Sequence, residues 1–263
     1  MLGAIAGDIA GSTREWNRVD TRDFPLFPDG SRFTDDTVLT AATAHAILTG
    51  GDYAAAYHAF GNRHPHAGYG GGFRKWLLSP ARQPYNSWGN GSAMRVSPVG
   101  WAFDTEEEVL REAERSAAVT HNHPHGVAGA QAVALGIFLA RHGASKQEIR
   151  RELGERFGYD LARTVEGIRP SYSFDVSSQG SVPEAIVAFL DAAAVEHAIR
   201  NAIWLGGDAD TQAAIAGSLA EAWHGGLPPL VRREAITRLS DDLREVTDRF
   251  AARYMRATTG DAP

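Results

Sequence analysis

The chain has 263 residues, of which 43% are hydrophobic, and it contains no cysteine. This length and apolar content suffice for one large core, so we expect residues 1–263 to form a single domain. The absence of cysteine excludes disulfides, thiolate chemistry and zinc held by cysteine. The formal net charge is −6 and no stripe of lysine and arginine is present, which argues against general binding to a nucleic-acid backbone.

The first ten residues are apolar but short, and they contain Asp8 and no basic stretch. They therefore resemble neither a signal peptide nor a membrane span. We expect a cytoplasmic protein without membrane association. No long heptad seam is present, so we expect a monomer.

Apolar residues recur mostly every three or four positions, which predicts a mainly α-helical chain. Small residues spaced by four predict central helices that approach one another closely. They include Gly3, Gly7 and Gly11. Capping-box patterns predict helix starts at Thr105, Ser145 and Ser181. The segment from Leu230 to about Thr258 predicts one or two peripheral helices, followed by a few disordered residues.

Three segments rich in glycine and polar residues predict loops within this helical frame, and loops of this kind tend to carry function. They are residues 67–73, 85–96 and 171–182. Backbone amides beside aromatic rings in the first two segments suit a pyrophosphate and a base or ribose, although both segments also fit ordinary turns.

Two acidic clusters about 170 residues apart carry the most chemical information. They are Thr34-Asp35-Asp36-Thr37 and Gly206-Gly207-Asp208-Ala209-Asp210-Thr211, each at a predicted helix start. Helix capping uses one carboxylate and leaves the second of each pair unexplained. Carboxylates forced together repel one another, so convergence of the clusters favours a divalent cation, and oxygen ligands favour Mg²⁺ or Mn²⁺.

Two further features are candidates for the same site. Glu15 follows the predicted first helix, whose end could direct it to the metals, although a surface position is the ordinary alternative. Three alternating histidines at 121, 123 and 125 fit a polar pocket loop better than a zinc site, because they lack the helical spacing and the cysteines of common zinc motifs.

Five motifs in this order resemble the ADP-ribosylglycohydrolase family, over residues 3 to about 225. They are Gly3-Ala4-Ile5-Ala6-Gly7-Asp8, Phe33-Thr34-Asp35-Asp36-Thr37, Gly89-Asn90-Gly91-Ser92-Ala93-Met94-Arg95, Thr120-His121 and Gly206-Gly207-Asp208-Ala209-Asp210-Thr211. The segment 174–186 also looks like the bacterial branch. The resemblance implies a compact all-α orthogonal helical domain with a central metal cleft. It also implies hydrolysis of the glycosidic bond between ADP-ribose and an acceptor, with release of ADP-ribose.

The resemblance further implies a centre of two Mg²⁺ or Mn²⁺ ions and roles for particular residues. The implied metal ligands are Thr34, Asp35, Asp36, Asp208, Asp210 and Thr211. The implied ADP-ribose contacts are Gly70, Gly71, Gly72, Gly89, Asn90, Gly91, Ser92 and His121. Glu15, Asp35 and Asp36 are the candidates for acid and base catalysis, with the roles unassigned among them.

Several alternatives remain open at the level of sequence. Arginine on a protein is the usual acceptor for bacterial members, while serine, nucleic-acid and small-molecule conjugates present the same ADP-ribose. A glycosidase that uses two carboxylates without metal is a different mechanism. A dinuclear-metal nucleotide phosphoesterase and a non-catalytic ADP-ribose-binding module are different functions.

Overall fold

The computed structural model describes residues 1–255, and this part of the chain is built from α-helices. The helices are α1 (Leu2–Gly11), α2 (Asp35–Thr49), α3 (Tyr53–Arg63), α4 (Gly71–Leu78), α5 (Gly91–Met94), α6 (Ser97–Ala102), α7 (Glu106–Ala118), α8 (Pro124–Arg141), α9 (Lys146–Phe157), α10 (Val165–Ile168), α11 (Ser178–Leu190), α12 (Val195–Leu205), α13 (Ala209–His224), α14 (Pro229–Thr237) and α15 (Asp241–Tyr254). Within residues 1–255, the only strand-type pairing outside helices is an isolated bridge between Gly89 and Ser177. The all-α prediction is confirmed.

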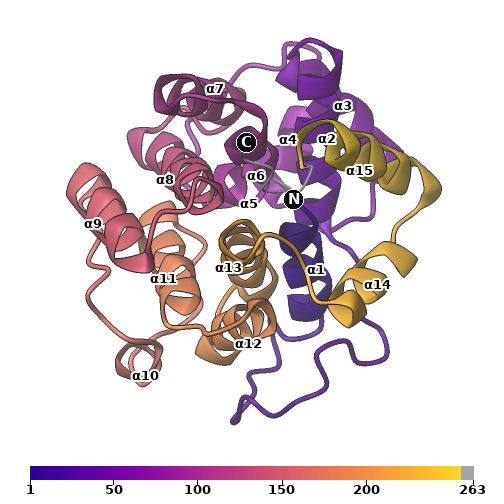
Figure 1. Ribbon diagram of the computed structural model, residues 1–263. Coiled ribbons are helices and arrows are strands. Elements are labelled where there is room, and N and C mark those ends of the chain that lie inside the picture. The colour runs from indigo at the N-terminus through magenta and orange to yellow at the C-terminus, as the bar shows by residue number, and fades with distance from the viewer. Residues whose placement is uncertain (256–263) are drawn as a thin grey trace, which may run out of the picture.

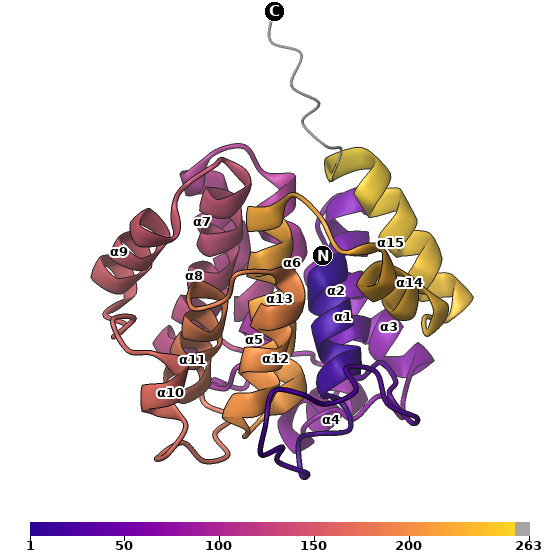
Figure 2. The ribbon, with the colours of Figure 1, turned by 60° about the horizontal axis from the view of Figure 1, so that its bottom comes forward.

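Helices α1 and α13 lie side by side at the centre of the molecule (Figures 1 and 2). All ten residues of α1 are buried, as are fourteen of the sixteen residues of α13. The glycine stripe explains this close approach, because a Cβ on Gly3 would lie 2.2 Å from the carbonyl oxygen of Gly217. The predicted central helix with small residues is therefore confirmed.

The other helices surround this central pair and share one continuous hydrophobic core. Helices α7, α8, α9 and α11 lie on the side of α13, and α2, α3, α14 and α15 lie on the side of α1 (Figure 1). The predicted peripheral segment after Leu230 forms α14 and α15, which confirms that prediction. Residues 256–263, which include the predicted disordered end, lie outside the described residues. In residues 1–255 no helix is both long enough and apolar enough to cross a membrane.

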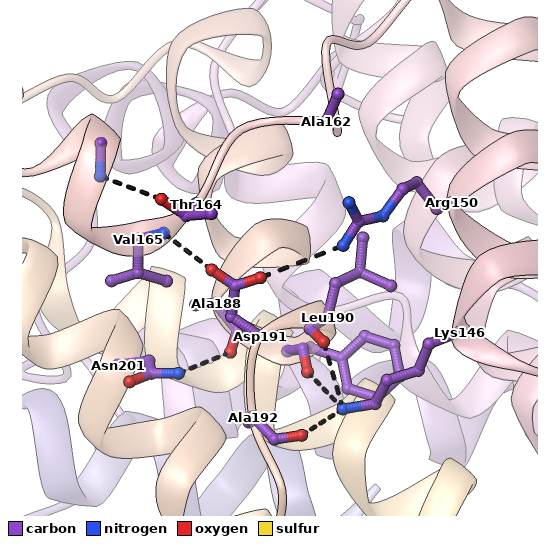
Figure 3. A network of polar contacts seen from close by, with 12 residues as sticks. Lys146, Arg150, Ala162, Thr164, Val165, Ala188, Leu190, Asp191, Ala192 and Asn201 are labelled. Carbon is purple, nitrogen blue, oxygen red and sulfur yellow. Dashed lines mark hydrogen bonds and ion pairs between the residues drawn. The ribbon is translucent and has the colours of Figure 1, made fainter.

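A polar network joins α9 to the loop between α11 and α12 (Figure 3). The Lys146 ammonium donates to the carbonyl oxygens of Phe189 at 2.9 Å and of Ala192, and it lies 5.0 Å from the centre of the Trp223 ring. Asp191 accepts a hydrogen bond of 2.8 Å from the Val165 amide at the start of α10. The half-buried lysine thus satisfies carbonyls that the end of α11 leaves free.

The predicted helix starts are accurate at two of three positions. Ser145 forms a complete capping box with Glu148, and Thr105 accepts from the Glu108 amide. The prediction of a start at Ser181 is wrong. Ser177 caps α11 instead, by accepting from the Gly180 amide, and Pro183 lies inside the helix.

The predicted loops are shorter than expected, because helices begin inside them. Helix α4 starts at Gly71, the short α5 starts at Gly91, and α11 starts at Ser178. The remaining irregular segments still lie at one end of the central helix pair. The loop after α1 and the start of α4 lie together at that end (Figure 2).

Candidate active site

The first acidic cluster forms the N-terminus of α2 around a buried carboxylate of α1. Asp8 is fully buried, and its two oxygens accept from the Thr34 hydroxyl at 2.6 Å, the Thr34 amide at 2.9 Å and the Thr37 amide at 3.1 Å. The Thr37 hydroxyl also donates to Asp8. Thr34 is the N-cap residue of α2, as capping predicts. Asp8 thus fixes the start of α2 against α1.

The second acidic cluster opens α13 and lies against the first. Asp208 is the N-cap residue, and the Thr211 hydroxyl donates to Asp36 Oδ1 at 3.5 Å across 175 positions of sequence. Close packing of α1 on α13 produces this meeting, because a Cβ on Gly11 would lie 2.5 Å from the Asp210 Cα atom. Both clusters therefore line one end of the central helix pair, and both predicted helix starts are confirmed.

Asn90 connects the second cluster to the glycine-rich segment before α5. Its side-chain amide donates to Asp208 Oδ2 at 2.7 Å and to the Ser181 hydroxyl at 3.1 Å. Its backbone amide donates to the carbonyl oxygen of Val176 at 2.9 Å. Asn90 therefore ties its own segment and the segment 176–181 to the acidic centre.

The carboxylates disfavour one another's charged forms. Burial, followed by repulsion from Asp210, raises the pKa of Asp8 to about 7 and the pKa of Asp35 to about 8. Burial and repulsion from Asp210 also raise the pKa values of Asp36 and Asp208 well above the ordinary range. Neighbouring like charges in a site of low polarity have this effect.

The donor set suits a hard divalent cation, although the side chains do not form a finished cage. Asp36 Oδ2 is buried without a hydrogen-bond partner, and none of the five clustered aspartates forms an ion pair within residues 1–255. In the same range, no three His, Asp or Glu side chains are arranged to hold an ion as they stand. Ligation therefore requires rotation of some side chains and the use of threonine hydroxyls.

A cavity of about 380 Å³ opens above the acidic clusters, which is within the usual range for small-molecule sites. Glu15 lies in its wall, half-buried, in the turn that follows α1. Partial burial and then repulsion from Asp210 raise the pKa of Glu15. All six residues predicted as metal ligands also line this cavity.

The predicted substrate loops contribute most, but not all, of their residues to the cavity. Gly70, Gly72, Gly89, Asn90, Gly91 and His121 line it. Gly71, the first residue of α4, does not line it. Ser92 is fully buried, does not line the cavity and donates to the carbonyl oxygen of Gly126 at 2.7 Å. The role of Ser92 in this position is to fix α5 against α8.

The three alternating histidines occupy different environments. His121 is buried in the cavity wall and shares a 2.7 Å hydrogen bond with the Thr120 hydroxyl. His123 caps α8 by accepting from the His125 amide, and His125 is exposed. Only the first of the three faces the cavity.

Sequence reasoning missed Asp8 as a member of the site. An ionisable residue within an otherwise apolar helix is a signal of a paired or functional buried group, because an isolated buried charge is costly. The carboxylate meets that expectation through Thr34 and Thr37. Its position also brings a fifth carboxylate beside the two clusters.

Comparisons with known proteins agree with this fold and site. The family model for ADP-ribosylglycohydrolase matches residues 1–259. The ADP-ribosylhydrolase ARH3 of Homo sapiens is 29% identical, with 86% of this chain and 84% of that protein covered. The ADP-ribosylarginine hydrolase Tri1 of Pseudomonas putida is 27% identical, with 87% of this chain and 71% of that protein covered. A solved ADP-ribosylglycohydrolase-related protein complex aligns with a TM-score of 0.71 and 27% identity, covering 95% of this chain and 94% of that one.

An all-α domain with an acidic cleft at one end of its central helices defines a helical glycosyl hydrolase. The chain belongs to the ADP-ribosylglycohydrolase family, and it is an enzyme of the ADP-ribosylhydrolase type.

Proposed function

We propose that this enzyme is a divalent-metal-dependent hydrolase that releases ADP-ribose from modified arginine on a protein. The observation that carries the metal requirement is the set of five crowded aspartates, none of which has an ion pair within residues 1–255. A divalent cation neutralises such a set, and oxygen ligands fit Mg²⁺ or Mn²⁺. Two ions are consistent with two acidic clusters that meet at one cavity.

The proposed ligands are the carboxylates and hydroxyls of the two clusters. They are Thr34, Asp35, Asp36, Asp208, Asp210 and Thr211. When bound, the metal supplies Lewis-acid stabilisation of charge and orients the hydroxyls of the distal ribose. Asp8 holds the Thr34 and Thr37 ends of α2 in place, and Asn90 holds Asp208. Both act by orienting neighbouring groups.

Glu15 is the proposed proton acceptor. It is the carboxylate of the cavity wall that lies on a turn and not in either acidic cluster, so it is free to meet a water molecule in the cavity. The water oxygen forms a bond to the anomeric carbon as the bond to the acceptor nitrogen breaks. Glu15 takes one proton from the water, and this proton passes on to the departing nitrogen, which regenerates the carboxylate. A raised pKa brings Glu15 closer to the working pH of such a base.

The glycine-lined wall of the cavity is the proposed binding site of the ADP-ribose moiety. Gly70 and Gly72 begin α4, and Gly89 to Gly91 lie beside His121, so backbone amides and one imidazole border the same space. Glycines allow the close approach of a diphosphate to the backbone. The hydrolase of Pseudomonas putida, named for ADP-ribosylarginine, supports arginine as the acceptor.

A comparison of two substrates tests the acceptor. Protein ADP-ribosylated on arginine and peptide ADP-ribosylated on serine are incubated with the enzyme and Mg²⁺, and released ADP-ribose is measured. The proposal predicts at least tenfold higher kcat/KM for the arginine linkage, which corresponds to ~1.4 kcal/mol in transition-state binding. Preference for serine would contradict the acceptor, while AMP or phosphate as the product would indicate a phosphoesterase.

A further inference from the structure

Arg95 is a buried guanidinium in the wall of the cavity. The residue is 0% exposed and forms no ion pair within residues 1–255. Its guanidinium carbon lies 4.1 Å from the centre of the Tyr57 ring. Nη2 donates to the Ser116 carbonyl oxygen at 3.3 Å and to the Thr120 hydroxyl oxygen at 2.8 Å. A charge buried this deeply is costly, so its retained contacts point to a defined task.

Thr120 lies between Arg95 and His121 and contacts both side chains. Its hydroxyl oxygen lies 2.7 Å from His121 Nδ1, and the Thr120 side chain is fully buried. The backbone is fixed as well, because the Thr120 and His121 amides both donate to the Ala117 carbonyl oxygen, at 3.0 and 2.7 Å. The imidazole is therefore held from behind by side-chain and backbone contacts.

The direction of the hydrogen bond between Arg95 and Thr120 follows from the donors available. An arginine only donates, so the Thr120 oxygen accepts from Arg95. With its oxygen accepting from Arg95, the Thr120 hydroxyl has one hydrogen to donate, and His121 Nδ1 lies within hydrogen-bond distance of it. In a neutral imidazole with Nδ1 as acceptor, the ring hydrogen is on Nε2.

The Nε2 edge of His121 faces the glycine segment of the cavity. A Cβ on Gly91 would lie 3.1 Å from Nε2, and a Cβ on Gly89 would lie 3.8 Å away. Glycine at both positions leaves this edge open to the cavity that Gly89, Gly91 and His121 line. Burial, and then the charge of Arg95, lowers the pKa of His121 well below its ordinary value, which keeps the ring neutral.

We propose that Arg95 and Thr120 are positioning residues that hold His121 in the Nε2–H tautomer, so that Nε2–H donates to an oxygen of ADP-ribose. This inference rests on the proposed function, because it takes ADP-ribose as the ligand of the cavity. The contacts from Arg95 through Thr120 to His121 give the cavity wall a neutral hydrogen-bond donor in a fixed position. A mobile or charged imidazole would orient the ligand less well. Thr120 acts from behind His121, because it is not among the residues that line the cavity.

Nuclear magnetic resonance tests the tautomer without any substrate. Protein labelled with ¹⁵N at histidine is recorded in a long-range proton–nitrogen correlation, and His121 is assigned by its absence in His121→Gln. The expected spectrum has a protonated Nε2 and an unprotonated Nδ1 for His121. In Thr120→Val the fixed tautomer is expected to give way to a mixture, and in Thr120→Ser it is expected to return. A wild-type ring protonated on Nδ1 would overturn the proposal.

Titration with ADP-ribose tests the consequence for binding. Thr120→Val is expected to raise the Kd about tenfold, the equivalent of ~1.4 kcal/mol, with Thr120→Ser close to wild type. The matched control is Thr247→Val, since Thr247 is equally buried but its hydroxyl donates to Leu243 within α15. Arg95→Lys keeps the charge but loses the paired hydrogen bonds to the Ser116 carbonyl and the Thr120 hydroxyl, so it is expected to weaken binding as well.

The outcomes separate this inference from the proposed function. Unchanged affinity and tautomer in Thr120→Val would show that the contacts through Thr120 have no positioning role. A wild-type protein that shows the expected tautomer but does not bind ADP-ribose would refute the proposed ligand, while the hydrogen-bond assignment would stand. Equal loss of affinity in Thr120→Val and Thr247→Val would indicate a general effect on the fold and would overturn the proposal.

Discussion

Gly7 of α1 lies directly against the Ala213 peptide of α13, so closely that a Cβ on Gly7 would lie 2.0 Å from the Ala213 carbonyl oxygen. This contact sets the separation of the two central helices. Asp8 follows Gly7 directly, and Asp210 lies one turn before Ala213. The helix contact therefore controls the distance between the carboxylates of the two helices.

Gly7→Ala is expected to destabilise the protein, because the added methyl group meets backbone atoms that cannot move away. Overpacking of a core costs about 1–3 kcal/mol. Chemical denaturation would measure the loss. Gly71→Ala is the matched control, since a Cβ there meets no atom within 4 Å and alanine favours a helix. Equal stability of the two variants would contradict the account.

The sequence was sufficient to predict the class of fold and the two helix starts at the acidic clusters. It was also sufficient to predict that Gly3, Gly7 and Gly11 face another helix. It did not identify α13 as that partner, because the contact joins residues about 200 positions apart and follows from the packing of the whole core.

The position of individual polar side chains was harder to predict. Ser92 follows a glycine-rich motif, yet its hydroxyl satisfies the Gly126 carbonyl of a neighbouring helix. Ser181 matches a capping box, yet it serves as a partner of Asn90 while Ser177 begins the helix. Local patterns identify which groups can bond, whereas tertiary packing decides with which partner.

Stability of the metal-free protein is expected to fall as the pH rises from 6.5 to 8.5. The pKa values of Asp8 and Asp35 are raised to about 7 and about 8 in the folded protein, against 3.8 for an ordinary aspartate. The folded state therefore binds more protons than the unfolded state in this range, and the free energy of unfolding decreases on deprotonation. Melting temperatures in EDTA would measure the decrease.

Asp36→Asn provides the comparison for this pH dependence. Burial and repulsion from Asp210 raise the pKa of Asp36 itself, so Asp36→Asn removes one of the titrations that lower stability, and its melting temperature is expected to change less between pH 6.5 and 8.5. Asp52→Asn is the control, because Asp52 caps α3 away from the cluster. Identical pH profiles for wild type and Asp36→Asn would contradict the proposed repulsion.

Glu15→Gln is expected to lower kcat about 10²-fold or more while the Kd for ADP-ribose changes little. A proton acceptor acts in the transition state, and general-base catalysis contributes about 10²–10⁴-fold. Single-turnover kinetics and direct titration would separate the two effects. A parallel loss of turnover and affinity would assign Glu15 to binding instead.

Lys146→Met is expected to lower stability by about 1.5–3 kcal/mol, the range for hydrogen bonds to a charged group. The change removes the donor to the carbonyls of Phe189 and Ala192 and also the cation above the Trp223 ring. Lys75→Met is the control, because Lys75 is exposed on α4. A stability equal to that of Lys75→Met would show that water satisfies those carbonyls equally well.

The central claim is that the crowded aspartates form a divalent-metal centre for ADP-ribosyl hydrolysis. Its most direct test is release of ADP-ribose from an arginine-modified protein by wild-type enzyme, first in EDTA and then after addition of excess Mg²⁺ or Mn²⁺. The account predicts loss of release in EDTA and its recovery with either cation. Full release in EDTA by an enzyme shown to be metal-free would contradict the metal centre and favour two-carboxylate chemistry.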